Sequence, residues 1–386
     1  MGDLTRAVIY LDYNATTPLA PAALEAMRPF LERVHGNPSS THAAGREARA
    51  AIDDARYQIA ALLGAKPGDV VFTGGGTESD NLAVIGLARA MVGKGRHLIT
   101  AATEHHAVLQ AFEWLEKHEG FRVTYLPVDA AGAISAAQVS EALTPETTLV
   151  SLMSANNETG VLHPVREFAE LCQQRGVLFH SDMIQTCGKQ PIPAAEFDAV
   201  SIAAHKFHGP KGVGALILRT AQPLQAIAVG GAHENQRRAG TENVAGIVGM
   251  AAALACAQDG MQEEQARQKE LRDRLWDGIQ RLAPDAICNG LEADRLPNTL
   301  NVTFPGIDAQ SMLMNLDLAG ICASSGSACM VGSIEPSHVL LAMGVPADLA
   351  QSSIRFSLGK LTTAEEIEHV LAVLPAILER LRPDPA

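Results

Sequence analysis

Lys206 is the first residue whose setting suggests chemistry. It lies just beyond 198–202, a mainly apolar run that predicts a buried strand, and it is flanked by His205 and a Phe-His-Gly-Pro turn. A lysine held at the edge of a core is partly desolvated, which makes its amine a usable nucleophile toward an aldehyde. A surface lysine in a turn is the alternative. We favour the reactive lysine over this alternative, because other stretches supply what an imine-forming lysine needs.

A glycine-rich turn, 73–80, links a predicted strand to a predicted helix. Its three glycines let the backbone approach an anion, and the helix N-terminus offers unpaired N–H groups. We expect Thr77 to cap the helix and to contact a phosphate. The spacing matches neither a Walker A loop nor the dinucleotide fingerprint, so it favours a single phosphate group. An ordinary strand–helix turn is the alternative.

Two polar residues follow other predicted strands. Asp182 can hold a pyridinium nitrogen protonated, although a helix N-cap is the simpler explanation for a lone aspartate. His105 can stack on a flat cofactor or transfer protons near pH 7, and a polar loop histidine is its alternative. His105 and His106 do not share a helix face and lack a spaced third ligand. A zinc hydrolase is therefore a distant alternative, and we expect no metal.

A cysteine and an arginine complete the set of reactive residues. Cys329 lies in 324–333, among small residues typical of an accessible loop, where a thiol can act as a nucleophile. Arg355 lies in 353–358, which alternates as a strand does. Its planar guanidinium can bind the carboxylate of an amino acid, with a structural ion pair as the competing explanation.

Composition limits the classes of protein to which the chain can belong. It has 386 residues, 47% of them hydrophobic, and a formal net charge of -13, which argues against nucleic-acid binding. Its six cysteines form no Cys-x-x-Cys pair, so we expect neither a disulfide framework nor structural zinc, and a reduced cytoplasmic setting. The sequence shows no secretory signal pattern and no apolar run of membrane-spanning length. We therefore expect no membrane association.

Strands and helices alternate through the first two thirds of the chain, which predicts an α/β fold with a mostly parallel sheet. In such sheets ligands bind at the carboxyl ends of the strands. One long helical region is expected from about 243 to 282, followed by a smaller α+β unit whose last helix begins with a capping box. Strands of the sheet are expected at 70–73, 97–102, 122–126, 148–153, 177–181, 198–202 and 214–218.

In this order, the motifs resemble those of the cysteine desulfurases that use pyridoxal 5'-phosphate (PLP). The likeness is to the NifS/IscS group of the class V aminotransferase superfamily, and closest to NifS. It runs from 10–18 to 355–358 and is strongest in 76–81, 156–160, 205–206, 237–243 and 324–329. It implies the type I fold of PLP-dependent transferases. The large domain would be 15–255, and the small domain would combine 1–14 with 256–386.

The resemblance also implies a role for each matching residue. Lys206 would carry PLP covalently, and Asn157 with Arg355 would bind the substrate carboxylate. Cys329 would accept the sulfur, and His105 would transfer protons. Because Thr241 would reach the phosphate of the partner subunit, a homodimer is implied. The remaining cofactor contacts would come from Asp182 to the ring nitrogen, Gln185 to the phenolic oxygen, His105 to the ring face, and Gly76, Thr77 and His205 to the phosphate.

The implied reaction converts L-cysteine to L-alanine and leaves a persulfide on Cys329. The sulfur would pass to a scaffold protein of the NifU/IscU kind for iron–sulfur cluster assembly, with nitrogenase maturation as one destination. The alternatives are a selenocysteine lyase, another class V reaction such as transamination, and a non-catalytic sulfur-transfer scaffold. The sequence departs from the usual family pattern at Ala203, Met183, Met330 and Val331, none of which removes an indispensable chemical group.

Overall fold

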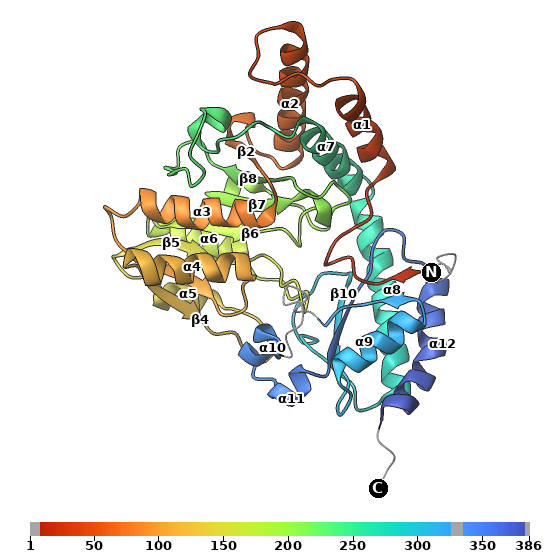
Figure 1. Ribbon diagram of the computed structural model, residues 1–386. Coiled ribbons are helices and arrows are strands. Elements are labelled where there is room, and N and C mark those ends of the chain that lie inside the picture. Colours follow the sequence, from red (N-terminus) through yellow and green to blue (C-terminus); the bar gives the residue numbers. More distant parts are fainter. Residues whose placement is uncertain (1–7, 326–334, 383–386) are drawn as a thin grey trace.

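The computed structural model describes residues 8–325 and 335–382. Its elements fall into two groups, each with its own hydrophobic core (Figure 1). The first group extends to about residue 258. The second is formed by the last third of the chain, joined by residues near the N-terminus. Cys329, Met330 and Val331 lie outside the described residues.

A seven-stranded sheet forms the centre of the first group. Strand β8 runs antiparallel to both of its neighbours, and every other pair is parallel, which confirms the predicted mostly parallel α/β sheet. In order across the sheet, the strands are β2 (Val70–Thr73), β8 (Gly214–Leu218), β7 (Ala199–Ala203), β6 (Leu178–Asp182), β5 (Thr147–Ser151), β3 (His97–Ala101) and β4 (Arg122–Leu126).

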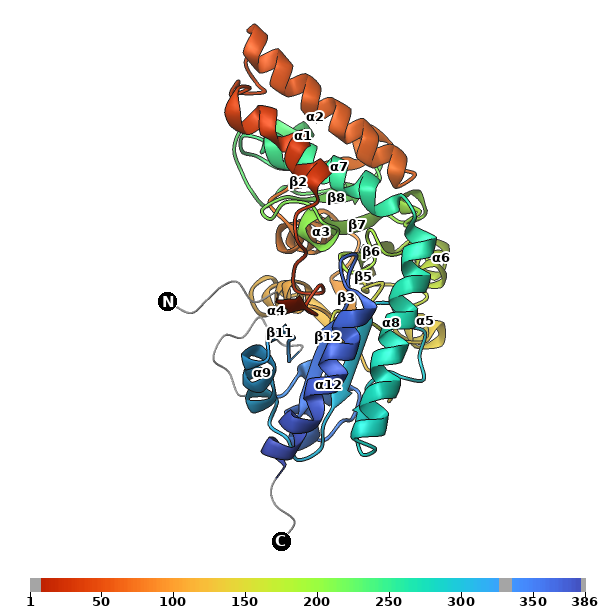
Figure 2. The ribbon, with the colours of Figure 1, turned by 90° about the vertical axis from the view of Figure 1, so that its right-hand side faces the viewer.

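Side-chain alternation along the strands builds two apolar layers, one on each face of the sheet. In β2, Val71 joins the core beneath helices α3 (Gly76–Ala90) and α4 (His106–Glu119). Val70 and Phe72 join the core on the opposite face. That core includes α2 (Ala43–Leu62), α6 (Val165–Gln174) and α7 (Val244–Gln258), while α1 (Pro21–Glu32) packs on α7 and the short α5 (Ala136–Ala142) lies near α6. Figure 2 shows α3 and α6 on opposite sides of the sheet.

The second group is a smaller α+β arrangement, as expected. Strand β10 (Thr299–Thr303) lies between β12 (Ser353–Ser357) and β9 (Ile287–Cys288), and all pairs are antiparallel. A separate parallel pair joins β1 (Ile9–Tyr10) to β11 (Ile321–Cys322). Helices α8 (Met261–Leu282), α9 (Ala309–Leu318) and α12 (Ala364–Leu381) pack against these strands, with α10 (His338–Ala342) and α11 (Ala347–Ala350) nearby. Helix α12 begins with the predicted capping box, between Thr363 and Glu366.

The expectation of one long helical region from 243 to 282 was wrong. Two helices, α7 and α8, meet there at a bend of 72°. Gly260 adopts φ +67°, a left-handed conformation that suits glycine and cannot continue a helix. No single helix among the described residues is long and apolar enough to cross a membrane. The α7–α8 pair meets the length and composition criteria only when both helices are counted across the bend.

Candidate active site

A cavity of about 390 Å³ opens where strands β6 and β7 end. This is the carboxyl edge of the parallel strands, where the alternating pattern placed a ligand site. Of the predicted site residues, nine line this one cavity: Gly76, Thr77, His105, Asn157, Asp182, Gln185, His205, Lys206 and Arg355. Thr241 is exposed and does not line it.

The end of β7 positions Lys206. All five residues of β7 are buried, and a single turn of 3-10 helix carries the chain out to the half-buried lysine. Lys206 Nζ donates hydrogen bonds to the carbonyl oxygens of Asn14, at 2.6 Å, and Ala15, at 2.9 Å. Gln185 Nε2 donates to the same Asn14 oxygen at 3.0 Å. The stretch around Asn14 therefore closes one side of the cavity around the lysine amine.

Asp182 ends β6 inside the protein. Burial raises its pKa to about 6, while a hydrogen bond from Ile184 N and the charge of Lys206 lower it. Two buried carboxyls, Asp80 and Glu104, have pKa values raised well above normal, first by burial and also by the charge of Asp182. Of these three acids, Asp182 is the one whose pKa is lowered by the charge of Lys206, which favours its ionised form.

His105 is the N-cap of α4. Its Nδ1 accepts a hydrogen bond from Ala107 N at 3.1 Å, so the neutral ring carries its proton on Nε2. Burial and the nearby charge of Lys206 lower the pKa of His105 to about 4, which keeps the ring neutral at pH 7. His106 lies beside it, with ring centroids 6.5 Å apart. Among the described residues, no three His, Cys, Asp or Glu side chains are placed to hold a metal ion.

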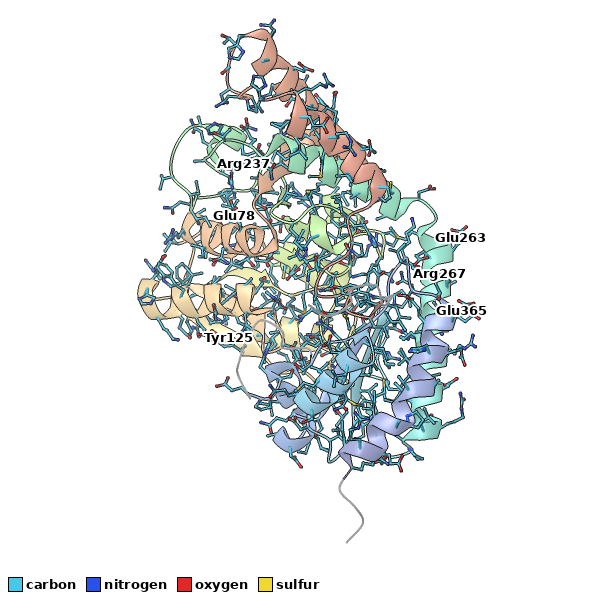
Figure 3. All side chains as sticks on the ribbon, turned by 45° about the vertical axis from the view of Figure 1, so that its right-hand side comes forward. Glu78, Tyr125, Arg237, Glu263, Arg267 and Glu365 are labelled. Carbon is cyan, nitrogen blue, oxygen red and sulfur yellow. The ribbon has the colours of Figure 1, made fainter. Side chains whose placement is uncertain are left out.

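The glycine-rich turn leads directly into α3. Gly75 is the N-cap, with φ +146°, so the expectation that Thr77 caps the helix was wrong; Thr77 lies in the first turn. A Cβ at Gly76 would lie 2.3 Å from Ile184 Cδ1, so a larger residue would require the helix end or the isoleucine to shift. Glu78, labelled in Figure 3, accepts hydrogen bonds from Gly74 N and from Arg238 Nε. Its carboxylate is therefore already paired and leaves the end of the helix to another anion. The first N–H groups of α3 are thus suited to an anion.

Arg355 reaches the cavity from β12, in the second group of elements. Its side chain is 3% exposed, and its Nη1 donates to the backbone oxygen of Asn157 at 2.9 Å. Its Nη2 donates to Asp12 Oδ1 at 2.8 Å, so the ion pair considered as an alternative is present as well. Arg355 Nε is buried and, within the described residues, has no hydrogen-bond acceptor. A ligand carboxylate would supply one.

The structure adds residues to which the sequence analysis gave no role. Asn14 and Asp80 line the cavity, and Asp12 contacts its arginine. All three lie within stretches that carried the family resemblance, 10–18 and 76–81. Their position inside these stretches was the available signal, because nothing in their own spacing indicated a site.

Comparison with known proteins places this geometry in a family. The model of the aminotransferase class-V family matches residues 9–370. The chain belongs to the class V aminotransferases. One relative, named cysteine desulfurase IscS, from Dictyoglomus turgidum, is 48% identical over 97% of this chain and 95% of its own length. A solved NifS-like protein superposes with a TM-score of 0.91 at 37% identity, covering 97% of this chain and 100% of that one.

A second solved structure shows a relative with an amino acid bound. It is described as SspA in complex with cysteine and has a TM-score of 0.80 at 36% identity, covering 91% of this chain and 98% of that one. Class V aminotransferases use PLP as their cofactor. The cavity of this class V enzyme fits that molecule. It combines an amine for an aldehyde, a buried acid for a ring nitrogen and a helix N-terminus for a phosphate.

Proposed function

We propose that this class V enzyme is a PLP-dependent cysteine desulfurase. It converts L-cysteine to L-alanine, and the sulfur atom moves to the thiol of Cys329 as a persulfide. One observation carries the proposal: Lys206, Asp182 and His105, from three separate element ends, line a single cavity together with Arg355 from strand β12. The name of the 48% identical relative supports cysteine as the substrate.

The residues that hold the cofactor would be those that line the cavity. Asp182 binds the ring nitrogen, His105 covers one ring face and Gln185 donates to the phenolic oxygen. The phosphate is held by Gly76, Thr77 and His205, together with Thr241 of the second subunit of a homodimer. When bound, PLP supplies an aldehyde for the substrate amine and a ring that accepts electron density from the α-carbon.

Lys206 would act as the base for the α-proton. The proton moves to Nζ, which then carries a positive charge close to two carbonyl oxygens. Hydrogen bonds to Asn14 O and Ala15 O, at 2.6 and 2.9 Å, stabilise this ammonium form. The arrangement therefore favours proton uptake by the lysine once the substrate amine has displaced it from the cofactor aldehyde. His105, with its proton on Nε2, is the second group that can transfer a proton within the cavity.

Substrate orientation would depend on Arg355 and Asn157, which bind the carboxylate. The Cys329 thiolate attacks the sulfur of the substrate, the carbon–sulfur bond breaks, and the carbon skeleton takes up a proton to become alanine. In balance, cysteine and one thiol give alanine and one persulfide. No further oxidant or reductant is required.

The sulfur has to leave Cys329 for an acceptor. We propose a scaffold protein of the NifU/IscU kind, which would direct the sulfur to iron–sulfur cluster assembly in the cytoplasm. We also propose that the two groups of elements are domains, a large one of 15–255 and a small one of 1–14 with 256–386. Their separate hydrophobic cores support that division.

Two substitutions test the proposed function. Lys206→Ala should abolish both the visible absorbance of the lysine-bound cofactor and alanine formation from cysteine. Cys329→Ser should keep that absorbance and stop alanine formation, because the sulfur acceptor is gone. Cys172→Ser, at a buried cysteine outside the cavity, is the matched control and should retain activity. Alanine formation at the normal rate by the Cys329→Ser enzyme would exclude Cys329 as the nucleophile.

A further inference from the structure

Arg355, the group proposed to bind the substrate carboxylate, is itself held by Asp12. Arg355 Nη2 donates to Asp12 Oδ1 at 2.8 Å, while Nη1 donates to Asn157 O at 2.9 Å. The arginine side chain is 3% exposed and the aspartate side chain 19% exposed. An ion pair so far removed from bulk water is only weakly screened. The contact therefore restricts the guanidinium more than a surface ion pair would.

The backbone fixes Asp12 at this place. Asp12 and Ser357 form a parallel bridge, so the N-terminal segment runs alongside β12. Tyr13 N donates to Ser357 O at 3.1 Å, and Ser357 N donates to Leu11 O at 2.7 Å. Arg355 lies two positions before Ser357, on the same face of the strand. Main-chain hydrogen bonds thus set the position of the carboxylate relative to the guanidinium.

Asp12 stands behind Arg355 and outside the cavity. Arg355 and Asn157 line the cavity, whereas Asp12 does not. Asp12 holds one end of the guanidinium, and Arg355 Nε, which lacks an acceptor among the described residues, stays available for a second anion. This geometry makes Asp12 a support that contacts the arginine from outside the cavity lining.

We propose that Asp12 is a positioning residue for carboxylate recognition, which fixes the guanidinium of Arg355 in the orientation that receives an α-amino acid. The inference rests on the proposed function, because it takes Arg355 as the carboxylate-binding group. A purely structural Asp12 would affect folding and leave ligand affinity unchanged. A positioning Asp12 changes affinity for ligands that carry a carboxylate and spares ligands that lack one.

The test compares Asp12→Ala and Asp12→Asn in the PLP-loaded enzyme. L-Alanine serves as a probe that carries the carboxylate but no sulfur, and its dissociation constant is read from the change in cofactor absorbance. In Asp12→Ala we expect the dissociation constant of L-alanine and the KM for cysteine to rise at least about tenfold, with kcat within about threefold of wild type. Asp12→Asn keeps an oxygen acceptor and should recover most of the affinity. L-Alanine methyl ester, which has no carboxylate, should bind all variants equally.

Asp285→Ala supplies the matched control, because Asp285 forms an exposed ion pair with Arg382 far from the site in sequence. Its ligand affinities should equal those of wild type. The inference would be overturned if Asp12→Ala bound L-alanine as tightly as wild type, or if Asp12→Asn bound it more tightly than wild type. An equal loss of affinity for L-alanine methyl ester would also overturn it. If Asp12→Ala does not fold, Asp12→Ser replaces it. A wild-type enzyme that forms no alanine from cysteine would defeat the proposed function, whereas an active wild type with unaffected Asp12 variants would defeat this inference alone.

Discussion

Asp182 holds a nearly buried carboxylate in the wall of the cavity. Burial raises its pKa from 3.8 to about 6, and the pKa would rise further without Lys206 and the hydrogen bond from Ile184 N. A charged group in such a place destabilises the folded chain unless a partner charge faces it. The protonated ring nitrogen of PLP would be such a partner. The site thus carries a charge that Lys206 and Ile184 N offset only in part and that the ligand would stabilise further.

This electrostatic cost gives a prediction for Asp182→Asn. Without cofactor, the variant should exceed wild type in free energy of unfolding by about 3 kcal/mol at pH 8, since about two pKa units separate the folded value from the unfolded 3.8. The folded pKa is raised, so wild-type stability falls as pH rises from about 4 through 6. The difference in free energy of unfolding between the variant and wild type should shrink below pH 6 and nearly vanish by about pH 4. Urea unfolding at several pH values measures it.

The control for this prediction is Asp277→Asn, at an exposed position on α8. It should leave the free energy of unfolding at pH 8 close to that of wild type. The Asp182→Asn protein should also retain PLP less well than wild type, because the ring nitrogen loses its anionic partner. Equal stability of Asp182→Asn and wild type at pH 8 would contradict the assignment of a buried charge to Asp182.

At the scale of elements, the junction of β2 and α3 positions the proposed phosphate site. The left-handed Gly75 turns the chain so that the helix starts at Gly76, and Gly76 packs directly against Ile184. A helix N-terminus has unpaired N–H groups and the positive end of the helix dipole. The missing side chain at Gly76 is what lets the helix end approach the cavity wall.

Gly76→Ala should therefore weaken PLP binding. The added Cβ would lie 2.3 Å from Ile184 Cδ1, so either the helix end or the isoleucine must move. We expect the dissociation constant of PLP to rise at least about tenfold, which corresponds to about 1.4 kcal/mol. Equilibrium titration of the cofactor-free enzyme with PLP measures the change.

Gly93→Ala is the matched control, because a Cβ at Gly93 meets no atom within 4 Å. Its PLP affinity should equal that of wild type. If both variants bind PLP as tightly as wild type, the close packing at Gly76 has no bearing on the cofactor.

Sequence patterns predicted some elements to the residue and missed others. The bounds of β4 and β8 agree with the expectation, since each is a short apolar-rich run with a proline or glycine at one border. The break at Gly260 was missed because helical periodicity continues on both sides of a single glycine. The two-residue strands β9 and β11 carry no pattern of their own. β11 exists through pairing with Ile9 and Tyr10, more than three hundred residues away.

At the scale of the whole molecule, the proposed homodimer would share residues between sites. Thr241 is exposed and lies outside the cavity of its own chain, as a residue that serves a partner should. Lys206 lines the cavity of its own chain. If the two act in different subunits, defects at these positions can complement each other in a mixed dimer.

Mixing Lys206→Ala with Thr241→Val subunits tests this arrangement. Each variant alone should be impaired, the first in all activity and the second in PLP affinity. After unfolding and refolding together, about half of the dimers should be mixed and each should hold one intact site, giving about a quarter of wild-type sites. Alanine formation at limiting PLP measures the recovery. Each variant refolded alone is the control, and a mixture no more active than the average of the two would refute sharing.

Prediction of the site depended on motifs more than on elements. Nine of the predicted residues line one cavity, because the carboxyl ends of neighbouring parallel strands meet at one edge. Cys329 lies outside the described residues, and Thr241 outside the cavity. Asp12 lies in a stretch that carried the family resemblance, but its contact with Arg355 could not be predicted, since it joins positions 343 residues apart and no local pattern specifies such a pairing.

The bend at Gly260 has a consequence for how this fold can diversify. The chain passes between the two groups of elements near Ala15 and again at the α7–α8 junction. Lys206 follows β7 in the first group, and Arg355 lies in β12 in the second. Small rotations about these two crossings would alter the gap between Lys206 and Arg355 while both interiors stay packed. Changes in the angles at these crossings can therefore alter the length of amino acid that such an enzyme accepts, without any replacement of the residues that contact the substrate.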